Sequence, residues 1–436
     1  MKNYRSAVMI LLVVLMALSI FTIGSEAAKK KSEVDLLEQE ADHCIEQQMP
    51  DKAAAYLEQL IDKNDRPEYY LKAAQMYLDA GRMAESEEWC LRAKNKFPKD
   101  PEAYEKLIEV LLIEESVDQA FEVLDEFKGR NLSSEKVDAM YEDMKYLWFD
   151  NLVLVDEVRM PSGGYFAFSK DSLWGLSTDL GKKKTQGIYS NLGYFANEMI
   201  SVSDQNGQWF FMDKEGRFTH NISASISDTI LSVGIYNEGL FPVQTDRGYY
   251  YCTLDMKAKQ EIYDYAGSFN AGIAAVQAGG LWYLIKEDGS VIDSAGYEDI
   301  LLDERGICCT KNRVFAKKQG EYQMLDNNGN RIGSDSFEDA VPFGTGEYTA
   351  VKKAGKWGFV DIDGKVVIQP FYDEAGPFAC GLAPVKTGDT WGYIDVQGES
   401  RIPSIYSDAY AFTGRGSALA QSEGRWYLIK LYEYNH

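Results

Sequence analysis

One short unit recurs through the last two-thirds of the chain, and it limits the fold more than any other feature. Each copy opens on an aromatic residue at the start of a strand-like run, and successive copies lie 32 to 41 residues apart. The opening positions are Trp174, Trp209, Tyr250, Trp282, Tyr322, Trp357, Trp391 and Trp426. A unit of this kind needs neighbours, because one small sheet cannot bury its own apolar face. The recurrence therefore predicts an all-β region built from tandem units.

The cleanest copy spans residues 356–386. A Trp-Gly pair opens its first strand, the letters DIDG at 361–364 form a tight turn, and two further strands follow. Glycine supplies the positive φ that closes such a hairpin, while an Asp or Asn side chain caps it. DIDG is similar to the start of a calcium loop, but Lys365 and Tyr372 stand where that loop needs an oxygen ligand and a glutamate. We therefore interpret DIDG as a hairpin turn, and comparable turns occur at residues 178–182, 213–217, 286–290, 326–330 and 395–399.

The repeat resembles the WG-repeat family, whose units open with Trp-Gly in the form WGFVD or WGYID. The segments WGFVDIDGKVVIQP (357–370) and WGYIDVQGESRIP (391–403) carry the resemblance, which extends over roughly residues 149–432. The earlier units are degenerate, since Trp209, Trp282 and Trp426 lack the following glycine and Tyr250 and Tyr322 replace the tryptophan. The repeat positions are expected to pack between units.

The two ends of the β region predict how its units close. The first segment, residues 149–170, looks like the back half of a unit, and residues 423–433 look like a front half. Shared strands of this kind remove free edges in propellers. We therefore expect a seven- or eight-bladed propeller-like ring, with an open β-solenoid as the alternative.

Residues 32–148 have a different character, with few Gly and Pro residues and with apolar residues at helical spacing. The segments PEYY at 67–70 and PEAY at 101–104 begin two ladders of large and small residues that are 34 residues apart. This region resembles tetratricopeptide repeats, with about three units and a following helix near residues 134–148. The resemblance implies a protein-interaction scaffold whose concave face holds peptides or partner helices. A spacer or docking base is the alternative, and the acidic helix faces leave open a groove for a basic partner.

Residues 1–31 form a targeting segment. Lys2 and Arg5 precede an uncharged run at residues 7–24, which is close to the length that crosses a bilayer. We expect a signal anchor that holds the globular part outside the cytoplasm, despite the positive charges at 29–31. A signal peptide cleaved after Ala27, giving a secreted protein, is the alternative.

Composition excludes some functions. A formal net charge of -23 and a pI of about 4.6 argue against nucleic acid as a partner. Three histidines, and six cysteines without a CxxC pair, argue against a zinc site, and no catalytic motif is present. We accordingly expect no enzyme activity, no cofactor, and no catalytic or metal-binding residues.

These observations predict an α+β multidomain protein with a segment at 1–31, helical repeats at 32–148 and a β domain at 149–436. The expected function is a membrane-tethered, extracytoplasmic scaffold that binds a protein or peptide non-covalently. One alternative is a carbohydrate- or cell-wall-binding module, with outward-facing aromatics such as residues 249–251, Tyr406 or Tyr410 stacking on sugars. Another is an enzyme with an unrecognised carboxylate site.

Overall fold

The computed structural model describes residues 33–259 and 261–434. The chain divides between Lys145 and Tyr146 into a helical unit and a β unit. The expected targeting segment at residues 1–31 lies outside the described residues.

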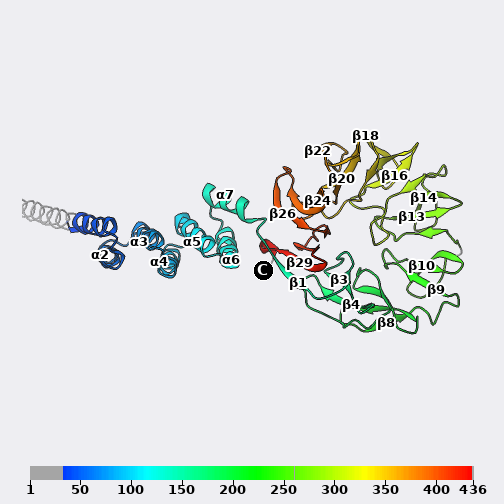
Figure 1. Ribbon diagram of the computed structural model, residues 1–436, viewed down its shortest axis with the longest axis horizontal. Coiled ribbons are helices and arrows are strands. Elements are labelled where there is room, and N and C mark those ends of the chain that lie inside the picture. The colour runs from blue at the N-terminus through cyan, green and yellow to red at the C-terminus, as the bar shows by residue number, and fades with distance from the viewer. Residues whose placement is uncertain (1–32, 260, 435–436) are drawn as a thin grey trace, which may run out of the picture. The chain divides into compact units, whose positions relative to one another are not determined.

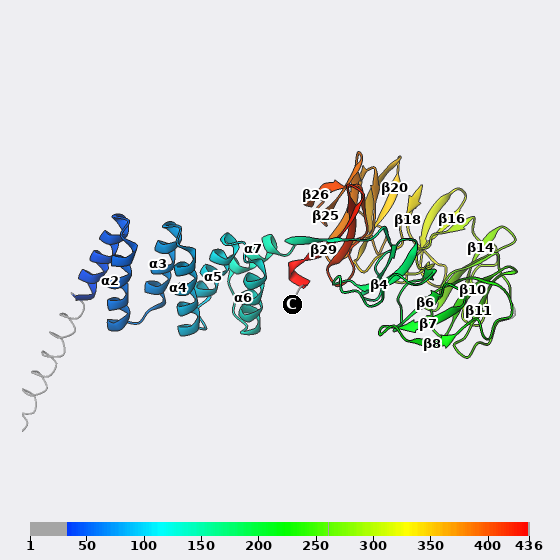
Figure 2. The same cartoon turned by 60° about the horizontal axis from the view of Figure 1, so that its bottom comes forward.

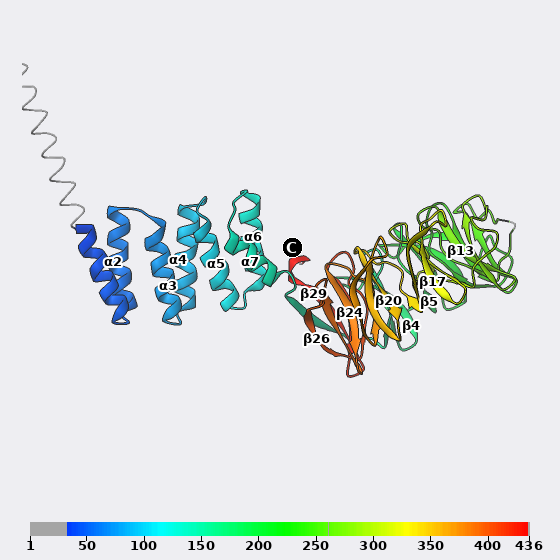
Figure 3. The same ribbon diagram turned by 90° about the horizontal axis from the view of Figure 1, so that it is seen from above.

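Seven helices follow one another along the chain in the described part of the helical unit, residues 33–145. Figures 2 and 3 show this succession. They cover residues 33–46, α2 (Pro50–Lys63), α3 (Pro67–Asp79), α4 (Met83–Lys96), α5 (Pro101–Ile113), α6 (Val117–Gly129) and α7 (Glu135–Met144). Helices α2, α3 and α5 each begin with a proline, whose fixed φ suits the first helical position and whose missing N–H is not needed there. Asp100 and Ser134 cap α5 and α7 by accepting hydrogen bonds from backbone N–H groups. These local signals explain where the helices begin.

The helices pack through alternating small and large side chains. Ala74 of α3 and Ser86 of α4 are fully buried, and Ser86 Oγ donates a 2.8 Å hydrogen bond to the Ala74 carbonyl. Beside this close approach, the Tyr70 ring packs edge-on against Trp89 and Phe97, with centroids 5.9 and 5.7 Å away. Small residues let the backbones approach, and the aromatic rings fill the remaining space.

Polar contacts between helices recur at about one repeat length. Arg92 donates from both Nη atoms to the two carboxylate oxygens of Glu58, at 2.7 and 2.9 Å, across 34 positions. Lys106 contacts Gln75 across 31 positions, and Ser134 Oγ donates to Glu105 across 29 positions at 2.5 Å. The helical unit is therefore a tandem array in which each helix contacts its neighbours in the chain.

The described residues of the β unit form eight small antiparallel sheets. Figure 1 shows how their strands follow one another. Three of them have three strands: β2 (Glu157–Val158), β3 (Tyr165–Lys170) and β4 (Leu173–Thr178); β9 (Ile230–Val233), β10 (Phe241–Thr245) and β11 (Gly248–Cys252); and β12 (Tyr265–Ala266), β13 (Ile273–Ala278) and β14 (Leu281–Lys286).

The other five sheets have four strands. They are formed by β5 (Asn191–Leu192), β6 (Met199–Ser203), β7 (Trp209–Asp213) and β8 (Phe218–Asn221); β15 (Asp299–Ile300), β16 (Val314–Lys318), β17 (Glu321–Leu325) and β18 (Arg331–Phe337); β19 (Asp339–Ala340), β20 (Tyr348–Lys353), β21 (Lys356–Asp361) and β22 (Val366–Tyr372); β23 (Glu374–Ala375), β24 (Leu382–Thr387), β25 (Thr390–Asp395) and β26 (Ser400–Tyr406); and β27 (Asp408–Ala409), β28 (Ser417–Ser422), β29 (Arg425–Leu431) and β1 (Trp148–Val153). A short 3-10 helix, Tyr432–Tyr434, follows β29.

The first and last strands of the β unit belong to one sheet. β1 pairs antiparallel with β29, with Trp148 opposite Leu431 and Val153 opposite Trp426. Apolar clusters lie between neighbouring sheets; for example, Phe211 of β7 packs edge-on against Phe241 of β10 with centroids 4.9 Å apart. The core of this unit is thus divided into several clusters shared by adjacent sheets.

The expectation of a closed seven- or eight-bladed propeller-like ring is wrong. The described β residues form eight separate small sheets, and they make neither a closed barrel nor a propeller. The units are also unequal, because in three of them the segment after the turn does not form a fourth strand. After β4, for example, only isolated bridges such as Ser177–Lys183 and Trp174–Tyr189 remain. The segment at 182–188, KKKTQGI, contains three consecutive lysines and a glycine, residue types that are depleted in strands.

The expected membrane segment lies in a part of the chain that the structure does not describe. Its apolar run at residues 7–24 falls outside the described residues. Within 33–259 and 261–434, none of the helices combines the length and the apolar character needed to cross a membrane.

Candidate functional site

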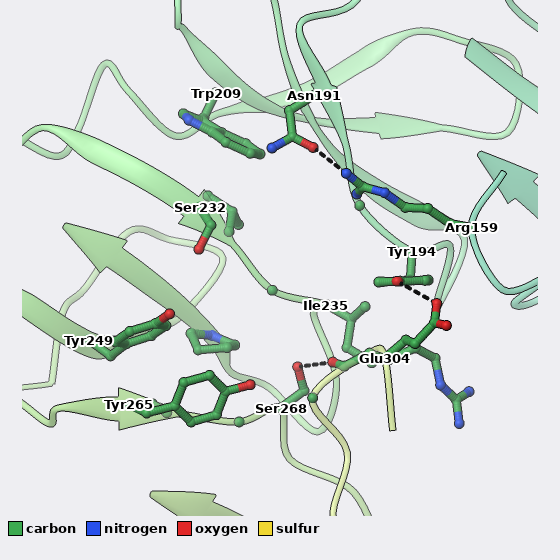
Figure 4. Close-up of a pocket in the computed structure, with 18 residues that line it drawn as sticks. Arg159, Asn191, Tyr194, Trp209, Ser232, Ile235, Tyr249, Tyr265, Ser268 and Glu304 are labelled. Atoms are coloured by element: carbon green, nitrogen blue, oxygen red, sulfur yellow. Dashed lines mark hydrogen bonds between the residues drawn. The ribbon is translucent and has the colours of Figure 1, made fainter. Parts of the chain in front are cut away.

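A recess of about 290 Å³ lies in the β unit (Figure 4). Its walls come from consecutive small sheets and from the loop that follows β15. The side chains that shape it are Arg159, Asn191, Tyr194, Trp209, Ser232, Tyr249, Tyr265 and Glu304. Trp209, Ser232, Tyr249 and Tyr265 lie on one side in Figure 4, and Arg159, Tyr194 and Glu304 lie on the other.

Glycines at one repeated backbone position help to hollow out this recess. The N–H groups of Gly193, Gly234 and Gly267 donate to Ser201, Pro242 and Ala275 in three consecutive units, at 2.8 to 2.9 Å. The same position is held by Arg159, Leu301, Val341, Gly376 and Tyr410 in the other units. Three adjacent units therefore have no side chain at this backbone position. Gly267 cannot carry a side chain, because a Cβ would lie 2.5 Å from the carbonyl oxygen of Gly306.

Glu304 links parts of the chain that are far apart in sequence. Tyr194 Oη donates a 2.9 Å hydrogen bond to Glu304 Oε2, and the backbone N–H of Met160 donates to the same oxygen at 3.3 Å. Burial and the neighbouring carboxylate of Glu304 raise the pKa of the Tyr194 hydroxyl. Glu304 therefore acts as an acceptor that holds the loop after β15 against the first two repeat units.

The two cations beside the recess already have partners. Arg159 Nη2 donates to Asn191 Oδ1 at 2.9 Å, Nη1 donates to the carbonyl of Leu192, and the guanidinium carbon lies 4.2 Å from the centre of the Trp174 ring. Burial lowers the pKa of Arg159, although a guanidinium stays charged at neutral pH. Arg305 forms an ion pair with Asp303 at 2.6 Å.

The remaining polar surface of the recess is neutral. The rings of Tyr249 and Tyr265 are half-buried, and their centroids lie 5.0 Å apart with their planes inclined by 46°. Burial raises the pKa of Tyr265 to about 12, so its hydroxyl stays protonated at neutral pH. Ser232 Oγ donates to Gln244 Oε1 at 2.9 Å. The recess can therefore offer hydroxyl groups and aromatic faces to a bound molecule.

The sequence-predicted repeat residues lie on equivalent strands of the eight sheets. Trp174, Trp209, Tyr250, Trp282, Tyr322, Trp357, Trp391 and Trp426 are found in β4, β7, β11, β14, β17, β21, β25 and β29. Strand register places Tyr249, not Tyr250, at the equivalent position in the third unit. Tyr249 pairs with Gln244 and forms a bridge with Tyr263, as Trp282 pairs with Gln277 and bridges Tyr297.

Other candidates from the sequence occupy structural positions. The side chain of Asp361 accepts hydrogen bonds from the N–H groups of Asp363 and Lys365, at 3.0 and 2.9 Å, so DIDG is a capped turn. Among the aromatics suggested for sugar stacking, Tyr250, Tyr251 and Tyr406 are buried, whereas Tyr249 and Tyr410 are half-buried. The six cysteines are all free thiols.

Sequence reasoning missed most of the recess. The sequence indicates Trp209 as a repeat position and Tyr249 as one of several aromatics, but it does not indicate Arg159, Tyr194, Ser232 or Glu304. The available signal is the recurring strand–Gly–Xaa–aromatic or strand–Gly–aromatic pattern NLGYF, SVGIY and YAGSF at 191–195, 232–236 and 265–269. It marks three consecutive units that lack a side chain at the same position.

Comparison with known proteins identifies the repeat. A family model described as "WG containing repeat" matches residues 262–282, 357–391 and 391–426. The β unit therefore contains WG repeats, which confirms this part of the resemblance seen in the sequence. No curated protein matches the chain.

Several solved structures are similar at low sequence identity. The computationally designed Ika8 protein is 11% identical, with 64% of this chain and 98% of that chain covered and a TM-score of 0.43. A catalytically inactive virginiamycin B lyase from Staphylococcus aureus with quinupristin is 9% identical, with 65% and 99% covered and a TM-score of 0.36. The Sgt2 TPR domain from Aspergillus fumigatus is 20% identical, with 26% and 76% covered and a TM-score of 0.22. With TM-scores below 0.5, these similarities carry no argument about fold or function.

Proposed function

We propose that the protein is a scaffold that binds a partner protein non-covalently, and that the helical unit is its main docking surface. In this proposal the helices at 33–145 are tetratricopeptide-like repeats. The 34-residue spacing of PEYY and PEAY and the recurring contacts between helices, such as Arg92 with Glu58, support this reading. Tandem helical arrays of this kind present extended surfaces to peptides and helices.

The charge distribution supports a basic partner. Residues 33–145 contain 29 Asp and Glu against 14 Lys and Arg, whereas the much longer stretch 146–436 contains 38 against 26. The negative charge is therefore concentrated in the helical unit. Such a surface raises the local concentration of cationic segments and speeds their association, especially at low ionic strength.

Three glutamates on helices α4 and the end of α5 form an acidic cluster on this surface. Burial and the nearby charge of Glu87 raise the pKa of the Glu114 carboxyl. Glu88, next to Glu87 on α4, is exposed to solvent. A lysine or arginine of a partner placed beside these carboxylates would relieve the repulsion between Glu87 and Glu114. Glu87, Glu88 and Glu114 form an acidic cluster. We expect the affinity for a basic partner to depend on the negative charges of this cluster.

The proposal includes a location outside the cytoplasm. It is motivated by the positive residues Lys2 and Arg5 followed by the uncharged run at 7–24. Protease treatment of intact host cells tests it. Digestion of the globular units without cell lysis supports the location, and full protection until lysis contradicts it.

Binding to defined peptides tests the docking surface. The full-length chain is titrated into a fluorescent lysine–serine peptide and a glutamate–serine peptide of equal length, and anisotropy is followed at low and high salt. We expect binding to the lysine–serine peptide alone, with affinity falling as salt rises. Equal binding of both peptides, or binding to neither, contradicts an acidic docking surface.

A further inference from the structure

The recess in the β unit has the chemistry of a ligand site that does not depend on the proposed protein scaffold. Its charged groups are already engaged: Glu304 accepts from Tyr194 and from Met160 N, and Arg159 donates to Asn191 and Leu192. Arg305 is paired with Asp303. An anionic ligand would have to displace these partners from the two arginines and would lie near the Glu304 carboxylate, so the arrangement favours a neutral molecule over an anion.

The groups that remain are suited to hydroxyl-rich compounds. The hydroxyls of Tyr249 and Tyr265 point into the space between the two sides of the recess (Figure 4). Asn191 uses its Oδ1 to accept from Arg159, which leaves its amide N–H groups directed elsewhere as donors. Together with Ser232, these side chains supply donors and acceptors without a net charge.

The angle between the rings of Tyr249 and Tyr265 favours a puckered sugar ring over a flat heterocycle. The planes of Tyr249 and Tyr265 are inclined by 46°, so the two rings cannot both lie parallel to one flat heterocycle. A puckered sugar ring can place C–H groups against one aromatic face and hydroxyls toward the other phenol. Trp209 lies on the same side of the recess, but its ring is 5% exposed and packs in an apolar cluster, so the two tyrosines supply the aromatic contact.

The size of the recess limits the ligand. Its volume of about 290 Å³ lies at the lower end of the range for small-molecule sites. We propose that this recess binds one or two units of a neutral saccharide, with Tyr249 and Tyr265 contacting the sugar directly.

Ligand binding by the full-length chain tests the proposal. The probes are D-glucose, D-galactose, N-acetyl-D-glucosamine and their β-linked disaccharides, with D-glucuronate as a charged probe and adenosine as a flat neutral one. Saturation-transfer NMR and quenching of tryptophan fluorescence report binding. At least one neutral sugar is expected to bind, in preference to glucuronate and adenosine.

Variants locate the binding site. Tyr249→Phe combined with Tyr265→Phe keeps both rings and removes both hydroxyls, and it should weaken sugar binding about tenfold. Tyr348→Phe is the matched control, because Tyr348 is half-buried in β20 and does not line the recess; its affinity should stay unchanged. Ser232→Ala offers a second, smaller change should the double variant fold poorly.

Three outcomes overturn the proposal. They are no sugar binding at millimolar concentration, a preference for glucuronate or adenosine, and sugar binding that is unchanged in both the tyrosine double variant and Ser232→Ala. The peptide experiment on the helical unit is unaffected by any of them, so the two proposals fail separately.

Discussion

The hydroxyl of Tyr194 donates a 2.9 Å hydrogen bond to Oε2 of Glu304, which lies 110 residues further along the chain. The same carboxylate oxygen accepts from the backbone N–H of Met160, so one loop residue joins three units of the β repeat. Contacts over such distances cannot be inferred from the repeat spacing, yet they shape the recess. Deleting single atoms of this contact should therefore change the free energy of unfolding of the β unit.

Removing the hydroxyl of Tyr194 should destabilise the β unit. Tyr194→Phe deletes a hydrogen bond to a charged acceptor, and because Glu304 is exposed to water we expect a loss of about 1 kcal/mol in the free energy of unfolding. Urea denaturation followed by tryptophan fluorescence measures it. Tyr348→Phe serves as the control, with a change within about 0.5 kcal/mol. Equal effects of the two substitutions contradict a specific role for the Tyr194–Glu304 bond.

Two glycines should respond in opposite ways to alanine. At Gly267 a Cβ would meet the carbonyl oxygen of Gly306 at 2.5 Å, so Gly267→Ala should lower stability by about 1–3 kcal/mol. At Gly129, the last residue of α6, a Cβ meets nothing within 4 Å, so Gly129→Ala should raise helical stability by roughly 0.5 kcal/mol. Thermal unfolding followed by circular dichroism measures both. Effects of the same sign would count against this packing.

Arg92 and Glu58 should be coupled across the helical repeat. The guanidinium binds both carboxylate oxygens and lies 3.9 Å from the centre of the Trp89 ring. Because both side chains are partly exposed, we expect a coupling energy of about 0.5 kcal/mol in a double-mutant cycle with Arg92→Lys and Glu58→Gln. The coupling should shrink in high salt. A cycle with no coupling at low salt would mean that this contact does not stabilise the array.

Asp179 should make stability depend on pH. Its carboxyl is buried, neither oxygen has a hydrogen bond, and the nearest cation atom recorded is Arg415 Nε at 3.4 Å. Burial raises the pKa of Asp179 above its usual 3.8, and this outweighs the attraction of Arg415 and Lys430. Between pH 3.8 and the folded-state pKa, the folded protein therefore keeps a proton on Asp179 that the unfolded chain releases. The contribution of Asp179 to stability is fully present below about pH 3.8 and is lost as the pH rises through the folded-state pKa.

The variant Asp179→Asn isolates this effect. Its stability relative to the natural chain should improve as the pH rises from 3.5 to 7, since the variant does not bury a charge at that position. Urea titrations at the two pH values give the difference. A stability difference that is constant, or that falls with pH, contradicts a raised pKa at Asp179.

Local features of the sequence predicted a large part of the fold. The proline-initiated helices and the Asp-capped hairpin at Asp361 follow from nearest-neighbour chemistry, and the Trp-Gly segments at 357 and 391 identified WG repeats. The expectation of a propeller-like ring was wrong, because the described β residues form eight separate small sheets, of which only five have four strands. In the third unit the register also shifts by one residue, from Tyr250 to Tyr249.

The recess could not be predicted in the same way. Its shape arises from an absent side chain at Gly193, Gly234 and Gly267, and from Glu304 reaching back to Tyr194. Both depend on which units become neighbours in space. Apolar periodicity reports the core of each unit and carries no information about such contacts.

The most direct test of the scaffold account is the affinity of the full-length chain for the lysine–serine peptide when the acidic cluster is neutralised. The triple variant Glu87→Gln, Glu88→Gln, Glu114→Gln should bind about fivefold more weakly at low salt, as expected for the loss of three partly exposed charge contacts. The matched control neutralises Glu261, Glu287 and Glu321, three exposed glutamates of the β unit, and should keep the natural affinity. Weakening by the first variant alone is the predicted result. Equal affinities for the natural chain and both variants would contradict docking of a basic partner on the helical unit.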